Sequence, residues 1–177
     1  MQCSVFIATS LDGYIARPDG SIDWLSAVQV DGEDYGYARF AETVDVIVLG
    51  RNTYDVVLGF AAWPYAGKRA IVMTNHPANS RHGEEFYAGA AADLVRRLAA
   101  EGARRVYIDG GVVIQQFRNA GLIDDLTISI IPVVLGEGIP LFAAGASEGR
   151  LTLVDVQSWP SGLVQLRYRL PEMPKTA

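Results

Sequence analysis

The chain has 177 residues, of which half are hydrophobic and a fifth are charged, and its formal net charge is −5 at pH 7. Length and composition predict one domain with a substantial core. The acidic balance, without any block of basic residues, argues against nucleic acid or an anionic membrane as a partner.

The cysteine, the histidines and the lengths of the apolar runs further limit the class of protein. Cys3 is the single cysteine and lies in an apolar run, so we expect no disulfide within the chain. No apolar run reaches transmembrane length and no signal-peptide pattern is present, so we expect a cytoplasmic protein. His76 and His82 have no pattern of further ligands around them, so we expect no metal site.

Strands and helices alternate through the first two thirds of the chain. We expect strands at 4–8, 45–49, 69–73 and 105–108. We expect helices from about Asp34, at 53–58, over a segment that ends near 101, and at 112–119. Residues 9–13 are expected to form a turn, residues 17–31 to be mostly loop, and residues 77–86 to be loop-like. This alternation predicts an α/β protein with a mostly parallel central sheet and helices on both faces.

The last third has a different pattern. We expect a long strand at 126–135, interrupted at Pro132, and then two alternating strands at 151–156 and 164–170 that form an antiparallel hairpin. The prediction is therefore a single domain over 1–170, followed by a mobile tail at 171–177.

Two strand–glycine–helix junctions are the most informative motifs. One apolar strand runs into Gly50-Arg51-Asn52-Thr53, and another runs into Asp109-Gly110-Gly111. Glycine lets backbone N–H groups approach a ligand, and the N-terminus of a helix favours negative charge. Both junctions follow strands, where α/β sheets bind ligands, so we expect them to hold one nucleotide cofactor. The forked cation of Arg51 suits a phosphate monoester, which favours NADPH over NADH.

Each junction also has a purely structural interpretation. Residues 50–53 can be a helix cap with a solvated arginine, and Gly110 and Gly111 can be a helix entry without a ligand. No G-x-G-x-x-G fingerprint is present, so an ordinary Rossmann domain is not predicted.

Candidate contacts outside the junctions keep two interpretations each. Asp34 can anchor a substrate nitrogen or favour a helix dipole, and Asp12 can contact the substrate or form a turn. Trp24 can stack on a flat heterocycle or pack in the core. Thr74 and Asn75 follow a strand and are expected near the ribose or adenine of the cofactor.

Together the motifs resemble the dihydrofolate reductase superfamily. The resemblance is carried by ATSLDGYIA at 8–16, GRNTY at 50–54 and DGG at 109–111. GLIDDL at 121–126 and PVVLGEG at 132–138 are similar to the reductase domain of bacterial riboflavin-biosynthesis proteins, the RibD C-terminal domain. The resemblance extends from Val5 to about Tyr168.

The resemblance implies an NADPH-dependent reductase of a small nitrogen heterocycle, with a dihydrofolate-reductase-like three-layer fold and a homodimeric assembly. It implies activity of the 5-amino-6-(5-phosphoribosylamino)uracil reductase type, as in riboflavin biosynthesis. In dihydrofolate reductases the glycine pair is joined by a cis peptide, which is the conformation to test at Gly110–Gly111. The cofactor-binding residues expected on this basis are Ala8, Ile15, Gly50, Arg51, Thr53, Thr74, Asn75, Gly110, Gly111, Val112, Val113 and Ile114.

Substrate contacts are carried over in the same way. The pterin-binding carboxylate of dihydrofolate reductases lies near the start of a helix, at a spacing like that from Asp34 to Gly50. The expected substrate contacts are Ser10, Asp12, Trp24 and Asp34. Asp34, Asp109 or a bound water is expected to assist protonation.

The chain also departs from the riboflavin-pathway pattern. Pyrimidine reductases of that pathway usually carry a lysine where this chain has Phe6 or Ile7, and a glutamate where it has Asp109. The alternatives are therefore dihydrofolate reduction and, in another class, a dimeric nucleotide-binding module without turnover.

Overall fold

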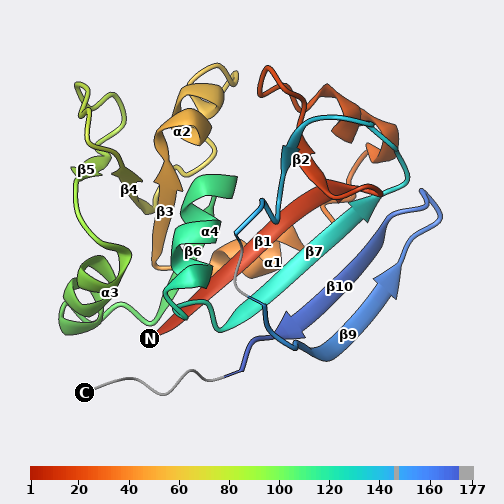
Figure 1. Cartoon of the computed structure of the whole chain (residues 1–177). Helices are drawn as coiled ribbons and strands as arrows, with labels where there is room; N and C mark the ends of the chain where they lie inside the picture. The colour runs from red at the N-terminus through yellow and green to blue at the C-terminus, as the bar shows by residue number, and fades with distance from the viewer. Residues whose placement is uncertain (146–147, 172–177) are drawn as a thin grey trace.

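A computed structural model of the chain describes residues 1–145 and 148–171 (Figure 1). Within this part the main sheet has eight strands in the order β5-β4-β3-β6-β1-β7-β10-β9, and β2 pairs with β8 in a small second sheet. The strands are β1 (Gln2–Ser10), β2 (Tyr14–Ala16), β3 (Val46–Gly50), β4 (Arg69–Met73), β5 (Glu85–Tyr87), β6 (Arg105–Asp109), β7 (Asp125–Ile131), β8 (Ile139–Pro140), β9 (Thr152–Ser158) and β10 (Val164–Arg169). The helices are the 3-10 helix η1 (Asp23–Val28), α1 (Tyr37–Glu42), α2 (Arg51–Val57), α3 (Ala91–Ala100) and α4 (Gly111–Asn119).

Most of the main sheet is parallel, as predicted. The strands from β5 across to β7 run parallel to their neighbours, whereas β10 is antiparallel to both β7 and β9. Helical connections return the chain to the same end of the sheet before each of β3, β4 and β6, which parallel pairing requires. The C-terminal pair forms the predicted antiparallel hairpin.

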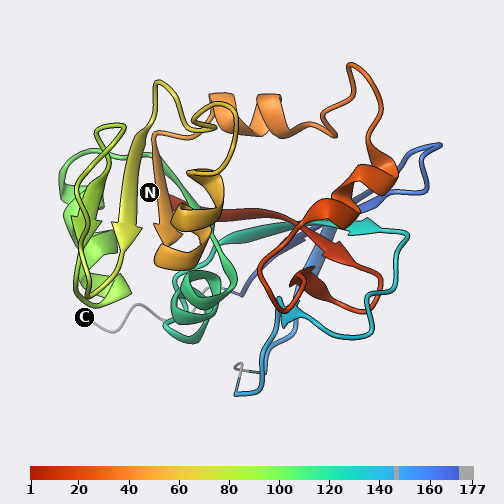
Figure 2. The same cartoon turned by 90° about the horizontal axis from the view of Figure 1, so that it is seen from above.

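Side-chain alternation along the strands builds three layers. Val46 and Val48 of β3 lie in one core cluster with residues of α3 and α4, whereas Ile47 and Leu49 lie in another with residues of α1 and α2. Figure 1 shows α4 in front of the sheet and α1 behind it, and Figure 2 shows the same layers from above. Because both faces are covered, β3 is apolar without interruption.

Two predictions near the N-terminus are corrected. Residues 17–31 are not only loop, because Trp24 and Val28 are buried on one side of η1 against Ile131 and Leu163. The helix expected from about Asp34 begins at Tyr37 and has only six residues. Its start is delayed because the chain passes through positive φ angles at Tyr35 and Gly36.

Three strands also differ from expectation. The strand β1 continues through Ser10, and β5 forms at the sheet edge within a stretch partly predicted as loop. The strand β7 ends at Ile131, because Pro132 has no N–H with which to continue the ladder. Apart from Pro171, the predicted mobile tail lies outside the described residues. In the described part, each helix is too short or too polar to cross a bilayer.

Candidate active site

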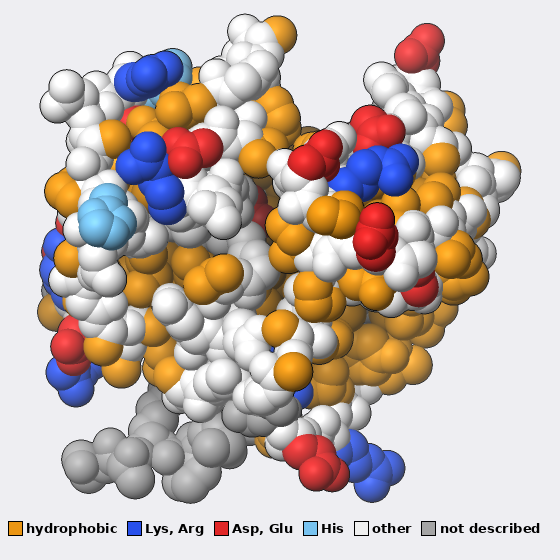
Figure 3. All heavy atoms as spheres, turned by 45° about the horizontal axis from the view of Figure 1, so that its top comes forward, with side chains coloured by type: hydrophobic (Ala, Val, Ile, Leu, Met, Phe, Trp, Pro, Cys, Tyr) orange, Lys and Arg blue, Asp and Glu red, His pale blue; other side chains and the backbone are white. Residues whose placement is uncertain are grey.

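A pocket of about 720 Å³ opens at the carboxyl ends of the parallel strands. Met73 of β4, Gly50 of β3, Asp109 of β6 and Ala8 of β1 all line it. Figure 3 shows this edge of the molecule hollowed between two lobes, with hydrophobic side chains along the walls. The pocket therefore lies where an open α/β sheet is expected to bind its ligand.

The two glycine junctions meet in this pocket. Strands β3 and β6 are neighbours, and Leu49 pairs with Asp109, so the junctions leave the sheet side by side. Gly110 has φ +90°, and a Cβ at this position would overlap the Thr53 hydroxyl. A Cβ on Gly111 would lie 2.9 Å from Cδ1 of Ile15. Glycine is therefore favoured at Gly110 by both its backbone angle and the Thr53 contact, whereas a methyl group at Gly111 would need only the end of the Ile15 side chain to shift.

The N-termini of α2 and α4 both face the pocket without a side-chain cap from their N-cap residues. These are Gly50 and Gly110, and neither can supply one. The first-turn N–H groups of each helix thus remain available to a ligand or to water. The Gly110–Gly111 peptide is trans, as are the other described peptide bonds, so the cis bond suggested by the dihydrofolate reductase resemblance is not present.

Arg51 lies on the β4 side of the pocket. Its Nε donates to both carboxylate oxygens of Asp55 at 2.9 Å, and its Nη1 donates to the His76 carbonyl at 3.0 Å. The ion pair is more than a third exposed, so it contributes little to stability. Its effect is to orient the guanidinium at the pocket edge, beside the start of α2.

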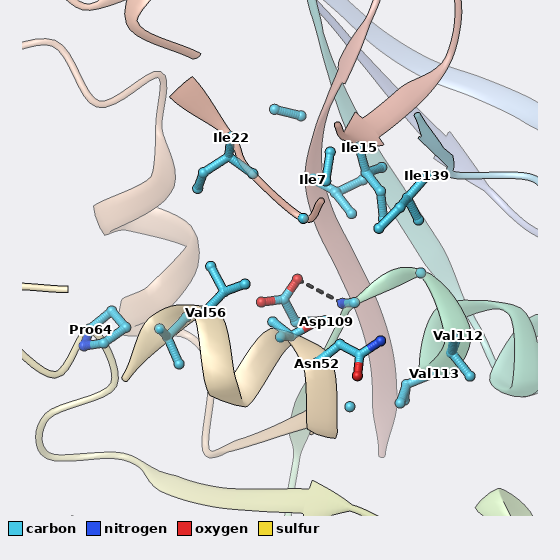
Figure 4. A pocket seen from close by; sticks show the side chains of 18 of the residues that line it. Ile7, Ile15, Ile22, Asn52, Val56, Pro64, Asp109, Val112, Val113 and Ile139 are labelled. Atoms are coloured by element: carbon cyan, nitrogen blue, oxygen red, sulfur yellow. Dashed lines mark hydrogen bonds between the residues drawn. The ribbon is translucent and has the colours of Figure 1, made fainter. Parts of the chain in front are cut away.

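Asp109 forms the floor of the pocket. The Tyr65 hydroxyl donates to Oδ2 at 2.9 Å, and the N–H of Gly110 donates to Oδ1 at 2.8 Å. Figure 4 shows Asp109 between Ile22, Val56 and Pro64 on one side and the start of α4 on the other. Burial raises the pKa of the Asp109 carboxyl above its usual range, and the two hydrogen bonds offset part of this rise.

Three tyrosines surround this carboxylate. Tyr107 lies two residues before Asp109 in β6 and donates to the Phe6 carbonyl at 2.9 Å, while Tyr37 packs edge-on against Phe6. Burial, together with the nearby Asp109 carboxylate, raises the pKa of Tyr37 to about 12 and those of Tyr65 and Tyr107 well above their usual range. The three phenols therefore remain protonated at physiological pH, so they are neutral hydrogen-bond donors.

Several predicted cofactor residues do line the pocket, but three do not. The residues that line it are Ala8, Ile15, Gly50, Arg51, Thr53, Gly110, Gly111, Val112 and Val113. Ile114 is 1% exposed and packs in the core beneath α4. Thr74 and Asn75 follow Met73 but lie outside the lining, and the Thr74 hydroxyl accepts the His76 N–H at 3.0 Å.

The structure places the predicted acidic substrate contact Asp34 at the start of α1. Asp34 lies outside the pocket lining, and its carboxylate accepts the N–H groups of Gly36 and Ala38, each at 2.8 Å. It therefore caps the start of α1, which leaves Asp109 as the carboxylate in the pocket among the described lining residues.

The other predicted substrate contacts also lie outside the lining. Asp12 accepts the N–H groups of Leu135 and Gly136, at 3.1 and 2.7 Å. The Ser10 hydroxyl and these N–H groups lower the pKa of Asp12 to about 2, so its charge fixes the loop after β7. Ser10 is buried and accepts the Tyr14 N–H, and Trp24 is buried against Ile131 at the end of β7 and Leu163 just before β10. These residues shape the fold around the site.

Some residues of the site were missed in the sequence. Tyr107 could have been predicted as a pocket residue, because residues two apart in a strand share a face and Tyr107 precedes Asp109 at that spacing. Asn52 and Val56 are one helical turn apart and both line the pocket. Tyr65 and Phe60 lie in irregular segments, so no periodicity pointed to them.

The fold is the one found in dihydrofolate reductases. The dihydrofolate reductase of Enterococcus faecalis, solved with NADP(H), superposes with a TM-score of 0.69 over 96% of both chains at 17% identity. A protein from Shewanella sp. PV-4, provisionally named as a riboflavin biosynthesis protein, superposes with a TM-score of 0.90 at 38% identity, over 97% of this chain and 99% of that one.

Sequence comparison gives the family. The profile of the RibD C-terminal domain matches residues 65–165. The uncharacterized protein YwjB of Bacillus subtilis is 40% identical over 168 residues, which cover 93% of this chain and 95% of YwjB. The riboflavin biosynthesis protein RibD of Corynebacterium ammoniagenes is 31% identical over 77% of this chain and 44% of its own length. The chain belongs to the RibD C-terminal domain family.

Proposed function

We propose that the protein is an NADPH-dependent reductase of a small nitrogen heterocycle. The observation that carries the proposal is the division of one pocket into two parts at Asp109. One part is bordered by glycine junctions and uncapped helix N-termini, and the other is bordered by apolar side chains. Structural neighbours that are named as reductases support an oxidoreductase.

The donors at the glycine junctions fit a dinucleotide. The first-turn N–H groups of α4 and the Thr53 hydroxyl suit a diphosphate, and the Arg51 guanidinium suits the 2′-phosphate that distinguishes NADPH from NADH. Ala8 and Ile15 also line the pocket and suit the nicotinamide ring. When bound, the reduced nicotinamide supplies a hydride to a C=N or C=O bond of the substrate.

The residues of the chain would orient the substrate and supply a proton. Asp109 lies on the floor where the two parts of the pocket meet, so a substrate nitrogen above it is within reach of its carboxyl group. The raised pKa of Asp109 favours the protonated form, which can donate to the nitrogen that accepts electron density. Tyr65 holds the carboxyl group in place, and the apolar walls exclude water.

The proposal is tested with the purified chain, NADPH and candidate heterocycles, by following the loss of nicotinamide absorbance. Candidates include 5-amino-6-(5-phosphoribosylamino)uracil, the substrate named for a Thermotoga maritima neighbour, and dihydrofolate. NADPH binding without turnover of any candidate would favour the nucleotide-binding module. Binding of neither NADPH nor NADH would remove the enzyme interpretation.

We also propose that the protein works in the cytoplasm as a homodimer, joined through β9 and β10. Leu153 pairs with Tyr168 and Val156 pairs with Leu166 across a β-bulge, so these four apolar side chains share one face of the sheet. Leu153 and Val156 are 51% and 53% exposed. An apolar strand at the edge of a sheet favours pairing with a second copy about a two-fold axis.

A further inference from the structure

The half of the pocket that lies beyond Asp109 from the glycine junctions has apolar walls. We call it the substrate half, and its lining comes from η1 and the loop before it, from α1, and from α2 and the segment after it (Figure 4). Its lining residues are Ile22, Leu25, Tyr37, Val56, Phe60 and Pro64. Apart from the Tyr37 hydroxyl these walls are hydrocarbon, so they stabilise an apolar ring by removing it from water and give a charged group no ionic partner.

No cation faces the substrate half among the described residues. Arg51 and Asp109 are the charged side chains of the pocket lining. Arg51 shares a helix face with Asp55, four residues later, and donates to the carbonyl of His76 beyond β4. Arg51 therefore lies at the β4 side of the pocket, whereas Ile22 and Leu25 belong to the segment that follows β1 and β2.

The loop that supplies Gly20 and Ile22 to the pocket lining carries a net negative charge. Gly20 and Ile22 line the pocket, and the segment that holds them carries Asp19, Asp23 and Arg17. Arg17 is bound by both oxygens of Asp23, with Nε–Oδ1 at 2.6 Å and Nη2–Oδ2 at 3.2 Å. This loop therefore carries two carboxylates and one guanidinium that is already paired with Asp23, so it offers an anionic ligand no free cation.

Given the reductase proposed above, we propose that its substrate is a flat, mostly apolar ring that carries neither a phosphate nor a carboxylate group. The ring would lie between the walls of the substrate half with one nitrogen over Asp109. The hydride and its electron pair would go to the carbon of the C=N or C=O bond, a proton would go to the nitrogen or oxygen, and NADPH would leave as NADP⁺. This chemistry needs no anionic handle on the substrate.

Matched pairs of compounds test the proposal. One pair is 5-amino-6-ribosylaminouracil with and without its 5′-phosphate. The other is 7,8-dihydrofolate and 6-methyl-7,8-dihydropterin, which lacks the whole p-aminobenzoylglutamate group with its two carboxylates. Equilibrium binding to the NADPH-loaded full chain is measured by calorimetry, and turnover is measured by NADPH absorbance. We expect the member without the anionic group to bind more tightly, and to turn over with higher kcat/KM, by about tenfold or more in at least one pair.

A charge-insertion variant sharpens the test. Phe60 is 44% exposed and lines the substrate half, so Phe60→Lys places a cation there without disturbing the core. We expect this variant to shift the preference toward the phosphorylated or glutamylated member by about tenfold. Leu11→Lys is the matched control, because Leu11 is 65% exposed and lies outside the lining, and it should leave the preference unchanged.

The outcomes separate this proposal from the general one. Tighter binding of the anionic member in both pairs, or binding of no member, would overturn the uncharged substrate class, whether or not NADPH is consumed. A preference for the uncharged member without any NADPH oxidation would support the substrate class and would count against the reductase function instead.

Discussion

The Tyr65 hydroxyl donates to the Asp109 carboxylate at 2.9 Å, joining an irregular segment before β4 to the end of β6. A hydrogen bond to a carboxylate favours its charged form, so Tyr65 lowers the pKa of Asp109 against the larger effect of burial. In Tyr65→Phe the pKa of Asp109 should rise. If Asp109 donates the proton, the alkaline limb of the pH profile of kcat should move to higher pH.

Tyr87→Phe is the control for this prediction, since the Tyr87 hydroxyl bonds only the Ala90 carbonyl in the described structure and lies away from the pocket. Its pH profile should match that of the parent chain. An alkaline limb that stays in place in Tyr65→Phe would show that the titration seen in kcat is not that of Asp109.

The raised pKa of Asp109 also makes stability depend on pH. Above pH 3.8 the unfolded chain releases this proton before the folded chain does, so the folded state binds more protons. The Asp109 contribution to the free energy of unfolding should therefore fall as pH rises from 3.8 to the folded pKa. Asp109→Asn removes this fall, so the variant should gain stability relative to the parent chain between pH 4 and pH 8. Urea unfolding at both pH values measures the difference, and a constant difference would contradict the prediction.

Arg51 is predicted to distinguish the two nicotinamide cofactors. Arg51→Ala should weaken NADPH binding by about 1–3 kcal/mol, the cost of a lost charged hydrogen bond, with a much smaller effect on NADH. Asp55→Asn is the control, because it keeps the guanidinium and removes the carboxylate that pairs with it. It should leave NADPH affinity equal or stronger. Equal weakening of NADPH and NADH by Arg51→Ala would remove the 2′-phosphate contact.

Gly110 is predicted to be required for packing as well as for its backbone conformation. A strained backbone angle alone costs about 1–3 kcal/mol. Gly110→Ala should lower the free energy of unfolding by more than this, because the new methyl group overlaps the Thr53 hydroxyl. Gly102 has a similar φ of +86° with no atom near its absent Cβ, so Gly102→Ala isolates the backbone term. Denaturant unfolding measures the loss of stability in each variant. Equal losses would show that the Thr53 side chain moves away from the new methyl group without a loss of stability.

The proposed dimer is tested by charge at the exposed sheet edge. Val156→Lys places an ammonium group in the apolar face of β9 and should shift the chain to a monomer in sedimentation or light scattering. Val134→Lys is the matched control, since Val134 is 66% exposed but lies outside the sheet. A parent chain that is monomeric at all concentrations would contradict the proposal directly.

The motifs that predicted the fold are those in which local spacing and long-range packing agree. The run Val46 to Leu49 forms a strand buried on both faces, and the hairpin of β9 and β10 follows the alternation of its residues. Helix boundaries were predicted less well where the spacing of apolar residues favours a helix but the backbone angles of nearby residues do not. The stripe that includes Tyr37 is real, but positive φ angles at Tyr35 and Gly36 shorten the helix that carries it.

The site divides in the same way. Glycines 50, 110 and 111 point to the strand ends without a structure, because a glycine between a strand and a helix allows either a ligand contact or a plain helix entry. The role of Asp34 could not be read from the sequence, because a carboxylate at the start of a helix can either cap the helix or contact a ligand. Its bonds to Gly36 and Ala38 in the structure are those of a helix cap.

The sequence by itself determined the alternating layers, the paired glycine junctions and their place at the strand ends, because periodicity and glycine conformation act over a few residues. The tertiary structure alone decided which carboxylate faces the pocket and which tyrosines surround that carboxylate. It also decided that the described lining of the substrate half holds no cationic side chain. Those contacts join segments far apart in the chain, such as Tyr65 and Asp109, and their distances depend on how the whole sheet packs.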